Sequence, residues 1–211
     1  MTILDFHTHH PGATAALIAV DPRQFAPQPG LWYSVGYHPW HNIDTLTDTD
    51  YETLRACSRH PQVIAIGETG IDRTRGAALD VQAEAFVRHL QLAHESGLPV
   101  VVHNVKATQD ILSVRSQARL DEVTLAIHGM RANGHVARTL LDAGCYLSFG
   151  PKFNPEALRI TPPDRLLVET DDSTMSISEV VERVALALHL TPEQITETAA
   201  GNAQRLLSHS L

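Results

Sequence analysis

Short apolar runs rich in β-branched residues recur along the whole chain, separated by segments of helical or loop character. Val63-Ile64-Ala65-Ile66 and Leu98-Pro99-Val100-Val101-Val102 are apolar throughout rather than alternating, which is typical of parallel strands covered on both faces. The runs predict eight strands: Ile3–His7, Ala16–Val20, Leu31–Gly36, Val63–Glu68, Pro99–His103, Val123–His128, Cys145–Phe149 and Leu166–Thr170. Strands in this number, alternating with helices, predict an α/β fold of the (β/α)8 TIM-barrel type.

Helical patterns fill most of the gaps between these runs. Asp80–Ser96 carries apolar residues at helical spacing and stops at Gly97, and Gly134–Ala143 repeats the arrangement. Ser176-Ile177-Ser178-Glu179 and Thr191-Pro192-Glu193-Gln194 read as capping boxes that open two further helices. The helices therefore follow the later strands of the predicted barrel.

The first two connections are shorter than a crossover helix requires. His9–Ala15 and the proline-rich Asp21–Gly30 leave too few residues, because parallel neighbours normally need a dozen or more. We therefore expect a small, distorted barrel that lacks its early helices. With 211 residues and 43% hydrophobic content, the chain is long enough for one buried core, so a single domain over residues 1–211 is predicted.

Charge and cysteine content narrow the classes of partner and compartment. A formal net charge of −8 argues against a broadly basic coat for nucleic acid. Cys57 and Cys145 occur in no metal-binding spacing, and two buried core thiols in a reducing compartment are expected. The chain shows neither a signal-peptide pattern nor a long apolar span. We expect a cytoplasmic protein without membrane contact, and the sequence indicates no obligate protein partner.

Side chains of metal-ligand type stand where most of the predicted strands end. In a barrel, catalytic groups gather at this carboxyl-terminal edge, so residues far apart in the sequence meet there. The candidate ligands are His7, His9, Glu68, His103, His128 and Asp171. Histidines and carboxylates in this number suit one or two divalent metal ions, namely zinc, manganese, iron or, less readily, magnesium.

Six ordered motifs resemble the signatures of the TatD-like metal-dependent hydrolases, a branch of the amidohydrolase-type barrels. The motifs are Asp5-Phe6-His7-Thr8-His9, Val35–Trp40, Ala65–Asp72, Leu98–His103, His128-Gly129 and Leu167–Asp171. The resemblance implies a metal-dependent nuclease, notably an exonuclease acting on DNA. It also implies that His7, His9, Glu68 and Asp171 hold one metal and that Glu68, His103 and His128 hold the other, with Glu68 as the bridge.

The chain departs from the family in the regions that would shape a substrate groove. It is shorter than typical members. His103-Asn104-Val105 stands where the family usually has His-Ser-Arg, and His128-Gly129-Met130-Arg131 where it commonly has His-Cys-Phe-Ser. The resemblance therefore supports the metal centre more strongly than it supports the nuclease activity.

Further roles follow for residues around the predicted mouth. Asp171 and Glu68 are the candidate catalytic carboxylates, with Asp171 accepting the proton of the attacking water. The candidate substrate-binding residues are His38, Trp40, Lys106 and Arg131.

Each of these substrate-binding candidates has its own interpretation. His38 matches a family motif near the scissile group. Trp40 could stack on a base or pack in the core. Lys106 and Arg131 are either phosphate clamps or solvated cations.

Asp5 and the remaining histidines stand outside this list. Asp5 is either a partner of a ligand histidine or a buried hydrogen-bonding group. The remaining histidines, His89 among them, receive no role, since an exposed helix face accounts for several of them.

Three functions are compatible with these residues. The first is a metal-dependent hydrolase of phosphodiester bonds, acting on nucleic acid or a small phosphodiester. The second is a metal-dependent ester or amide hydrolase, for example an aminoacyl-tRNA deacylase or a small-metabolite hydrolase. The third is a metal-binding protein without turnover, whose expected signature is a missing ligand, whereas all six positions are filled.

Overall fold

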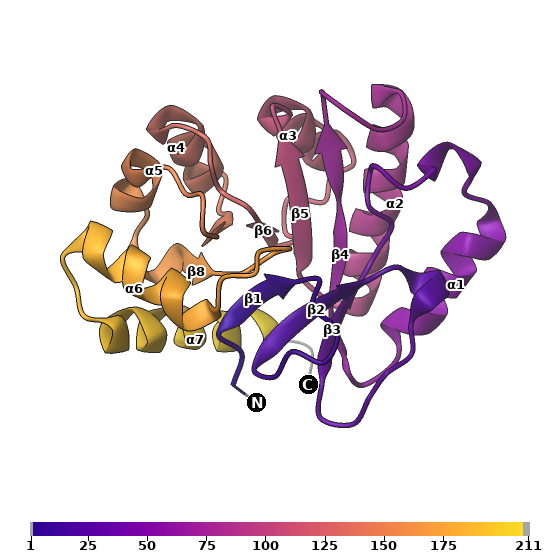
Figure 1. The fold of residues 1–211 in the computed structure, drawn as a ribbon. Helices are drawn as coiled ribbons and strands as arrows, with labels where there is room; N and C mark the ends of the chain where they lie inside the picture. The colour runs from indigo at the N-terminus through magenta and orange to yellow at the C-terminus, as the bar shows by residue number, and fades with distance from the viewer. Residues whose placement is uncertain (1, 209–211) are drawn as a thin grey trace.

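Eight parallel strands form a closed barrel in chain order within residues 2–208, the part of the chain that the computed structural model describes (Figure 1). The strands are β1 Asp5–Thr8, β2 Ala16–Val20, β3 Trp32–Val35, β4 Val63–Asp72, β5 Val100–Val105, β6 Leu125–Ile127, β7 Tyr146–Phe149 and β8 Leu166–Val168. Each overlaps one of the predicted strands, and the TIM-type barrel is confirmed.

Helices follow the later strands and cover the outside of the barrel. They are α1 Asp48–Ser58, α2 Leu79–Ser96, α3 Thr108–Gln117, α4 Gly134–Asp142, α5 Pro155–Ile160, α6 Ile177–Leu188 and α7 Pro192–Leu207. The capping boxes at Ser176 and Thr191 are both formed, and Gly97 ends α2 in the left-handed conformation. No helix within residues 2–208 is long and apolar enough to cross a bilayer.

The first two connections lack an α-helix, as their lengths predict. β1 and β2 are joined by a loop, and the β2–β3 connection holds only the 3-10 turn η1 Pro22–Gln24. Two further 3-10 turns, η2 Ile43–Thr45 and η3 Pro163–Arg165, precede α1 and β8. The chain therefore reaches β3 without an intervening α-helix, and the first helix, α1, contacts β3 and β4.

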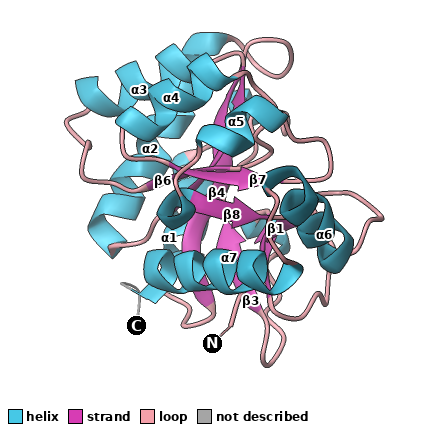
Figure 2. Cartoon of the chain, turned by 90° about the vertical axis from the view of Figure 1, so that its left-hand side faces the viewer, coloured by secondary structure: helices cyan, strands magenta, loops and turns pink. Residues whose placement is uncertain are grey.

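The apolar side chains separate into two buried clusters. Along β5, Val100 and Val102 belong to the larger cluster and Val101 to the smaller one, as the alternation of a strand requires. Helix α7 lies across the barrel beside β8 (Figure 2). There the Asn202 amide donates hydrogen bonds to the carbonyls of Pro163 and Leu166, which fixes α7 against the start of β8.

His89 departs from the exposed helix face expected for several of the unassigned histidines. Its side chain is fully buried on α2, because position 89 lies on the same helix face as Phe86, Leu90 and Ala93. The Tyr37 backbone N–H donates to His89 Nε2 at 3.0 Å, and Nδ1 lies 2.7 Å from the Ala85 carbonyl oxygen. These contacts assign the proton of the neutral ring to Nδ1.

Strands β4 and β5 continue beyond the rim of the barrel, which the apolar runs do not predict (Figure 1). The extension pairs Gly70 with His103 and Asp72 with Val105. The register shifts between Ile66 and Thr69, so Glu68 lies at an irregularity within β4 rather than at its end. A β-bulge of this kind re-aims a side chain next to a functional site.

Candidate metal centre

Glu68 lies at the centre of the predicted ligand set. Its Oε2 atom lies 3.3 Å from His7 Nε2 and 3.2 Å from His9 Nε2. Its Oε1 atom lies 2.8 Å from His103 Nδ1 and 2.7 Å from His128 Nε2. The two carboxylate oxygens thus face two different histidine pairs, the arrangement that a bridging carboxylate needs.

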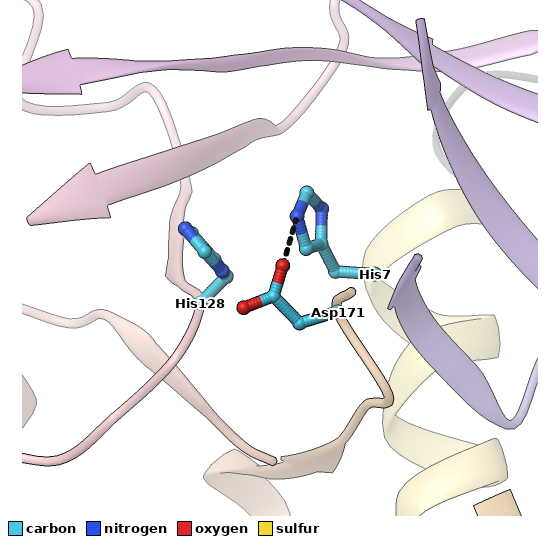
Figure 3. Close-up of side chains that lie close together, drawn as sticks. All are labelled: His7, His128 and Asp171. Atoms are coloured by element: carbon cyan, nitrogen blue, oxygen red, sulfur yellow. Dashed lines mark ion pairs between the residues drawn. The ribbon is translucent and has the colours of Figure 1, made fainter. Parts of the chain in front are cut away.

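Asp171 joins the pair formed by His7 and His9. Its Oδ1 atom lies 3.9 Å from His7 Nε2 and 3.7 Å from His9 Nε2. Figure 3 shows His7, His128 and Asp171 directed toward one another from β1, from the loop after β6 and from the loop after β8. Hydrogen bonds join the Asp171 backbone N–H to the His7 carbonyl and the His9 N–H to the Asp171 carbonyl, so the two loops are held together.

His38 lies closer to the cluster than its predicted substrate-binding role requires. Its Nε2 atom lies 2.9 Å from Glu68 Oε1 and 3.3 Å from His103 Nδ1. Ligand atoms of His38, Glu68 and His103 lie close enough together to hold one metal ion, as do those of His7, His9 and Glu68, and those of His7, His128 and Asp171. The structure therefore brings all six predicted ligands together and adds His38 to them.

Two buried carboxylates that the sequence analysis did not select stand behind the histidines. Asp72 Oδ2 lies 3.3 Å from His103 Nε2, and Glu169 Oε1 lies 3.5 Å from His128 Nδ1. Carboxylates in such positions fix the ring orientation of a ligand histidine and raise its basicity. Glu169 could have been found from its place two residues before Asp171, whereas Asp72 requires the unforeseen extension of β4.

Asp5 acts as a buried hydrogen-bonding group. Its carboxylate accepts hydrogen bonds from the Thr170 backbone N–H at 2.8 Å and from the Thr170 hydroxyl at 2.6 Å. Burial raises the pKa of Asp5 to about 6, although the bonds from Thr170 oppose the rise. The side chain thereby links β1 to the segment that leads into Asp171.

The charges of the cluster are strongly coupled. Burial by itself raises the pKa of Glu68, but the positive charges of His128 and His7 and the hydrogen bonds from the surrounding rings outweigh it and hold the pKa well below its usual value. Burial lowers the pKa of His128, but Glu68 and Glu169 raise it well above its usual value. The site therefore holds an anionic carboxylate among groups that favour positive charge.

A divalent cation fits this arrangement. His7 Nε2 and Glu68 Oε2 are buried and make no hydrogen bond, although they face each other at 3.3 Å. Buried polar atoms without partners are costly, and imidazole nitrogens with carboxylate oxygens form the donor set of zinc and related ions. A cation between them would satisfy both atoms.

The other predicted substrate residues lie at different distances from the cluster. Trp40 donates its indole N–H to Asp72 Oδ2 at 2.8 Å, and the guanidinium of Arg75 lies 4.2 Å from its ring centroid. Arg131 Nη2 lies 3.5 Å from Asp171 Oδ2. Lys106 is exposed directly after β5 and lines neither of the two cavities that reach Glu68.

Those two cavities open on the cluster from different sides. One, of about 290 Å³, lies over His38, Trp40 and Asp171. The other, of about 460 Å³, starts at His9 and Glu68 and extends along β2 and β3. Solvent and a small substrate can therefore reach Glu68.

Comparison with known protein families identifies the family of this chain. The profile of the family described as TatD related DNase matches residues 23–208. The chain belongs to the TatD family. The TatD-family protein YabD of Bacillus subtilis, named an uncharacterized metal-dependent hydrolase, is 30% identical over 93% of this chain and 83% of its own length.

Two further TatD-family relatives are informative. The crystal structure of the TatD homologue YjjV from Escherichia coli superposes with a TM-score of 0.83 at 17% identity, covering 98% of both chains. It shows the shared fold. A Cronobacter turicensis protein named 3'-5' ssDNA/RNA exonuclease TatD is 35% identical over 67% of this chain and 57% of its own length.

Proposed function

We propose that the protein is a metal-dependent hydrolase that cleaves phosphodiester bonds, with single-stranded nucleic acid or a small phosphodiester as substrate. The observation that carries the proposal is the position of Glu68, whose two carboxylate oxygens face separate histidine pairs. The names of the relatives YabD and exonuclease TatD support the hydrolase class and the phosphodiester bond, respectively.

The proposed ligands divide between the two oxygens of Glu68. His7, His9 and Asp171 would hold one divalent metal ion, and His103 and His128 the other, with His38 adjacent to the second group. Bound there, the metal would lower the pKa of a water molecule toward neutrality and polarise a phosphoryl oxygen.

The chain's own residues supply the remaining roles. Asp171 lines the mouth and would accept the proton of the attacking water. Arg131, beside Asp171, would bind a phosphate oxygen, since a guanidinium donates in a fork that matches phosphate geometry.

The test is hydrolysis by chelator-treated protein reloaded with manganese, zinc, iron or magnesium. Substrates are single-stranded DNA, single-stranded RNA and methyl p-nitrophenyl phosphate. We expect cleavage that chelation abolishes and metal restores. Glu68→Gln should remove it, whereas Glu197→Gln on the exposed surface of α7 should not. If the metal-loaded protein cleaves none of the three substrates, or if the Glu68→Gln variant remains active, the proposal is contradicted.

A second candidate function is hydrolysis of a carboxylic ester or amide. It is favoured by the residues that line the two cavities at Glu68, none of which is lysine or arginine within the described chain. A neutral substrate meets no charge penalty there. Comparing p-nitrophenyl acetate and an aminoacyl ester with the phosphodiesters, in the same metal-loaded preparation, separates the two functions.

A further inference from the structure

A cavity lies at the end of the barrel opposite the candidate metal centre. It is lined by residues that stand before or at the start of four strands: Pro99 before β5, Thr124 before β6, Tyr146 in β7 and Arg165 before β8. In a parallel barrel these amino-terminal ends share one rim, whereas the proposed metal ligands gather at the carboxyl-terminal rim. Arg205 lines the cavity from α7.

The accessible lining of this cavity is polar. Apolar lining residues such as Leu98 and Val123 are only 7% and 5% exposed, so they offer a ligand little surface. Arg165 and Thr124 are half-buried, and Arg205 is exposed. A ligand would therefore meet hydrogen-bond donors rather than an apolar wall.

Arg165 lines the cavity without a partner for its charge. Its guanidinium lies 4.7 Å from the ring centroid of Tyr146 and makes no hydrogen bond or ion pair with any residue between 2 and 208. By contrast, Arg88, which lines the cavity between α1 and α2, pairs with Asp48 at 2.7 Å. Stacking on Tyr146 leaves the in-plane N–H groups of Arg165 able to bind an anion.

Arg205 supplies a second guanidinium to the same cavity. It donates a hydrogen bond to the side-chain oxygen of Asn202, whose amide donates to the carbonyls of Pro163 and Leu166. These contacts tie Arg205 to the segment that carries Arg165. Two guanidinium groups at one cavity suit a phosphate, because its oxygens match their forked N–H geometry.

Among the described residues, one carboxylate lines the cavity, and it has a partner. Glu122 Oε1 lies 2.8 Å from His94 Nδ1, and both side chains are 56% exposed, which places the pair at the solvent edge. Two arginines thus face a single paired carboxylate, in a protein whose formal net charge is −8. The Thr124 hydroxyl has no hydrogen-bond partner within residues 2–208 and adds a donor.

We propose that this cavity binds a small sugar phosphate, with the phosphate on Arg165 and Arg205 and the sugar hydroxyls toward Thr124, His94 and Glu122. Its volume of about 440 Å³ falls in the range of roughly 300–1,000 Å³ typical of small-molecule sites, and a lone phosphate would leave most of it empty. The inference does not rest on the proposed hydrolysis, because this cavity shares no lining residue with the two cavities at Glu68.

The test is isothermal titration calorimetry on the whole chain after chelator treatment, with ribose 5-phosphate, inorganic phosphate and ribose as probes. Chelation removes any metal ion that would attract phosphate to Glu68. We expect ribose 5-phosphate to bind, and Arg165→Gln to weaken this binding about tenfold, because a charge-assisted hydrogen bond is lost. Arg159→Gln, at an exposed position of α5 that lines none of the described cavities, should bind as wild type does.

Arg131→Gln separates this cavity from the mouth of the barrel, where Arg131 lies beside Asp171. Binding that is weakened in Arg131→Gln and unchanged in Arg165→Gln overturns the proposal. So does the absence of ribose 5-phosphate binding to wild type, or equal affinity for ribose. Equal affinity for inorganic phosphate overturns the sugar phosphate as the occupant, because the free anion alone would then account for the binding.

A second pair of variants tests the cavity with both arginines intact. Gly144 lines the cavity and Gly30 does not; both are exposed, with φ values of +80° and +81°, and a Cβ atom at either position would meet no atom within 4 Å. Aspartate tolerates this left-handed conformation better than most residues. We expect Gly144→Asp to weaken ribose 5-phosphate binding by charge repulsion and Gly30→Asp to leave it unchanged, with circular dichroism checking the fold. Equal affinity in these two variants contradicts the site.

Discussion

The chemistry of the candidate metal centre depends on single side chains, and Glu68 contacts more of the other candidate ligands than any other of these residues does. Its carboxylate is buried, yet histidines approach both oxygens. Behind those histidines, Asp72 and Glu169 face the ring nitrogens that point away from Glu68. The orientation of His103 and His128 therefore depends on residues that contact no proposed substrate.

Asp72→Asn and Glu169→Gln test that dependence. Each replaces a charged acceptor with a neutral amide of similar size, so we expect metal affinity to fall roughly 10–100-fold with the fold retained. Competition with a chromophoric chelator measures the affinity, and circular dichroism checks the fold. Asp164→Asn and Glu197→Gln, both at exposed positions, provide controls. Wild-type affinity in both variants would show that the two carboxylates do not support the centre.

His89 gives a prediction for pH. Burial lowers its pKa to about 4, because the charged ring would lose its hydration. A proton on Nε2 would also face the backbone N–H of Tyr37. The unfolded chain, with an ordinary histidine pKa near 6.5, then binds the proton first as the pH falls. His89 therefore contributes stability that is complete above about pH 6.5 and is lost between there and pH 4, roughly 3 kcal/mol in all.

Urea unfolding at several pH values isolates this effect. His89→Gln should lose less stability than wild type between pH 7 and pH 5, although it is less stable at pH 7. His135→Gln, on the exposed side of α4, should follow wild type. An identical pH dependence in wild type and His89→Gln would refute the assignment of a neutral buried ring.

Among the elements, the close pairing of β4 with β5 restricts the residue type at one position of β4. Gly70 has a φ of +145°, and a Cβ atom there would collide with the carbonyl oxygen of His103. Glycine at this position lets β4 and β5 pair closely beyond the rim, where His103 must meet Asp72. The extension thus depends on a residue without a side chain.

Two alanine substitutions should have opposite effects. Gly70→Ala forces β4 from β5 and should cost more than about 1 kcal/mol of unfolding free energy. Gly201→Ala lies within α7, where the new Cβ atom meets only Arg205 Nη1 at 3.7 Å, and should add about 0.5–1 kcal/mol. Equilibrium urea unfolding measures both, and a Gly70→Ala variant as stable as wild type would contradict the close pairing.

The elements also show what a sequence pattern can predict. Strands that are buried on both faces appear in the sequence as apolar runs, so the runs predict all eight strands. The absence of helices in the first two connections follows from the small number of residues between the runs. The extension of β4 was missed because Gly70 and Asp72 break the apolar pattern that marked the strand. Helix α1 was missed although Thr47 and Asp50 form its capping box, since aspartate replaces the usual glutamate or glutamine.

The same reasoning explains why the sequence predicts some residues of the candidate metal centre and does not predict others. The six proposed ligands stand at or near the ends of predicted strands, and the closed barrel brings those ends together. The contacts of His38 with Glu68 and of Glu169 with His128 depend on loop geometry and on the bulge in β4. No periodicity in the sequence encodes such distances.

At the scale of the whole molecule, the proposed ligands tie together strands from both halves of the chain. We expect chelation to lower the melting temperature and added metal to restore it, because a ligand bound only by the folded state stabilises by about 2.7 kcal/mol at a hundredfold excess over Kd. Scanning calorimetry of wild type and Glu68→Gln measures the shift. A melting temperature insensitive to both chelator and metal would exclude metal binding by the folded chain.

The closure of the barrel has a consequence for synthesis. β1 pairs with β8, and the backbone bonds between His7, His9 and Asp171 span more than three quarters of the 211 residues. A ribosome that has released only the first 160 residues has produced His7, His9, Glu68, His103 and His128 without the strand and carboxylate that enclose them. The centre is therefore completed last, and truncated translation products lack Asp171 and the strand that closes the barrel.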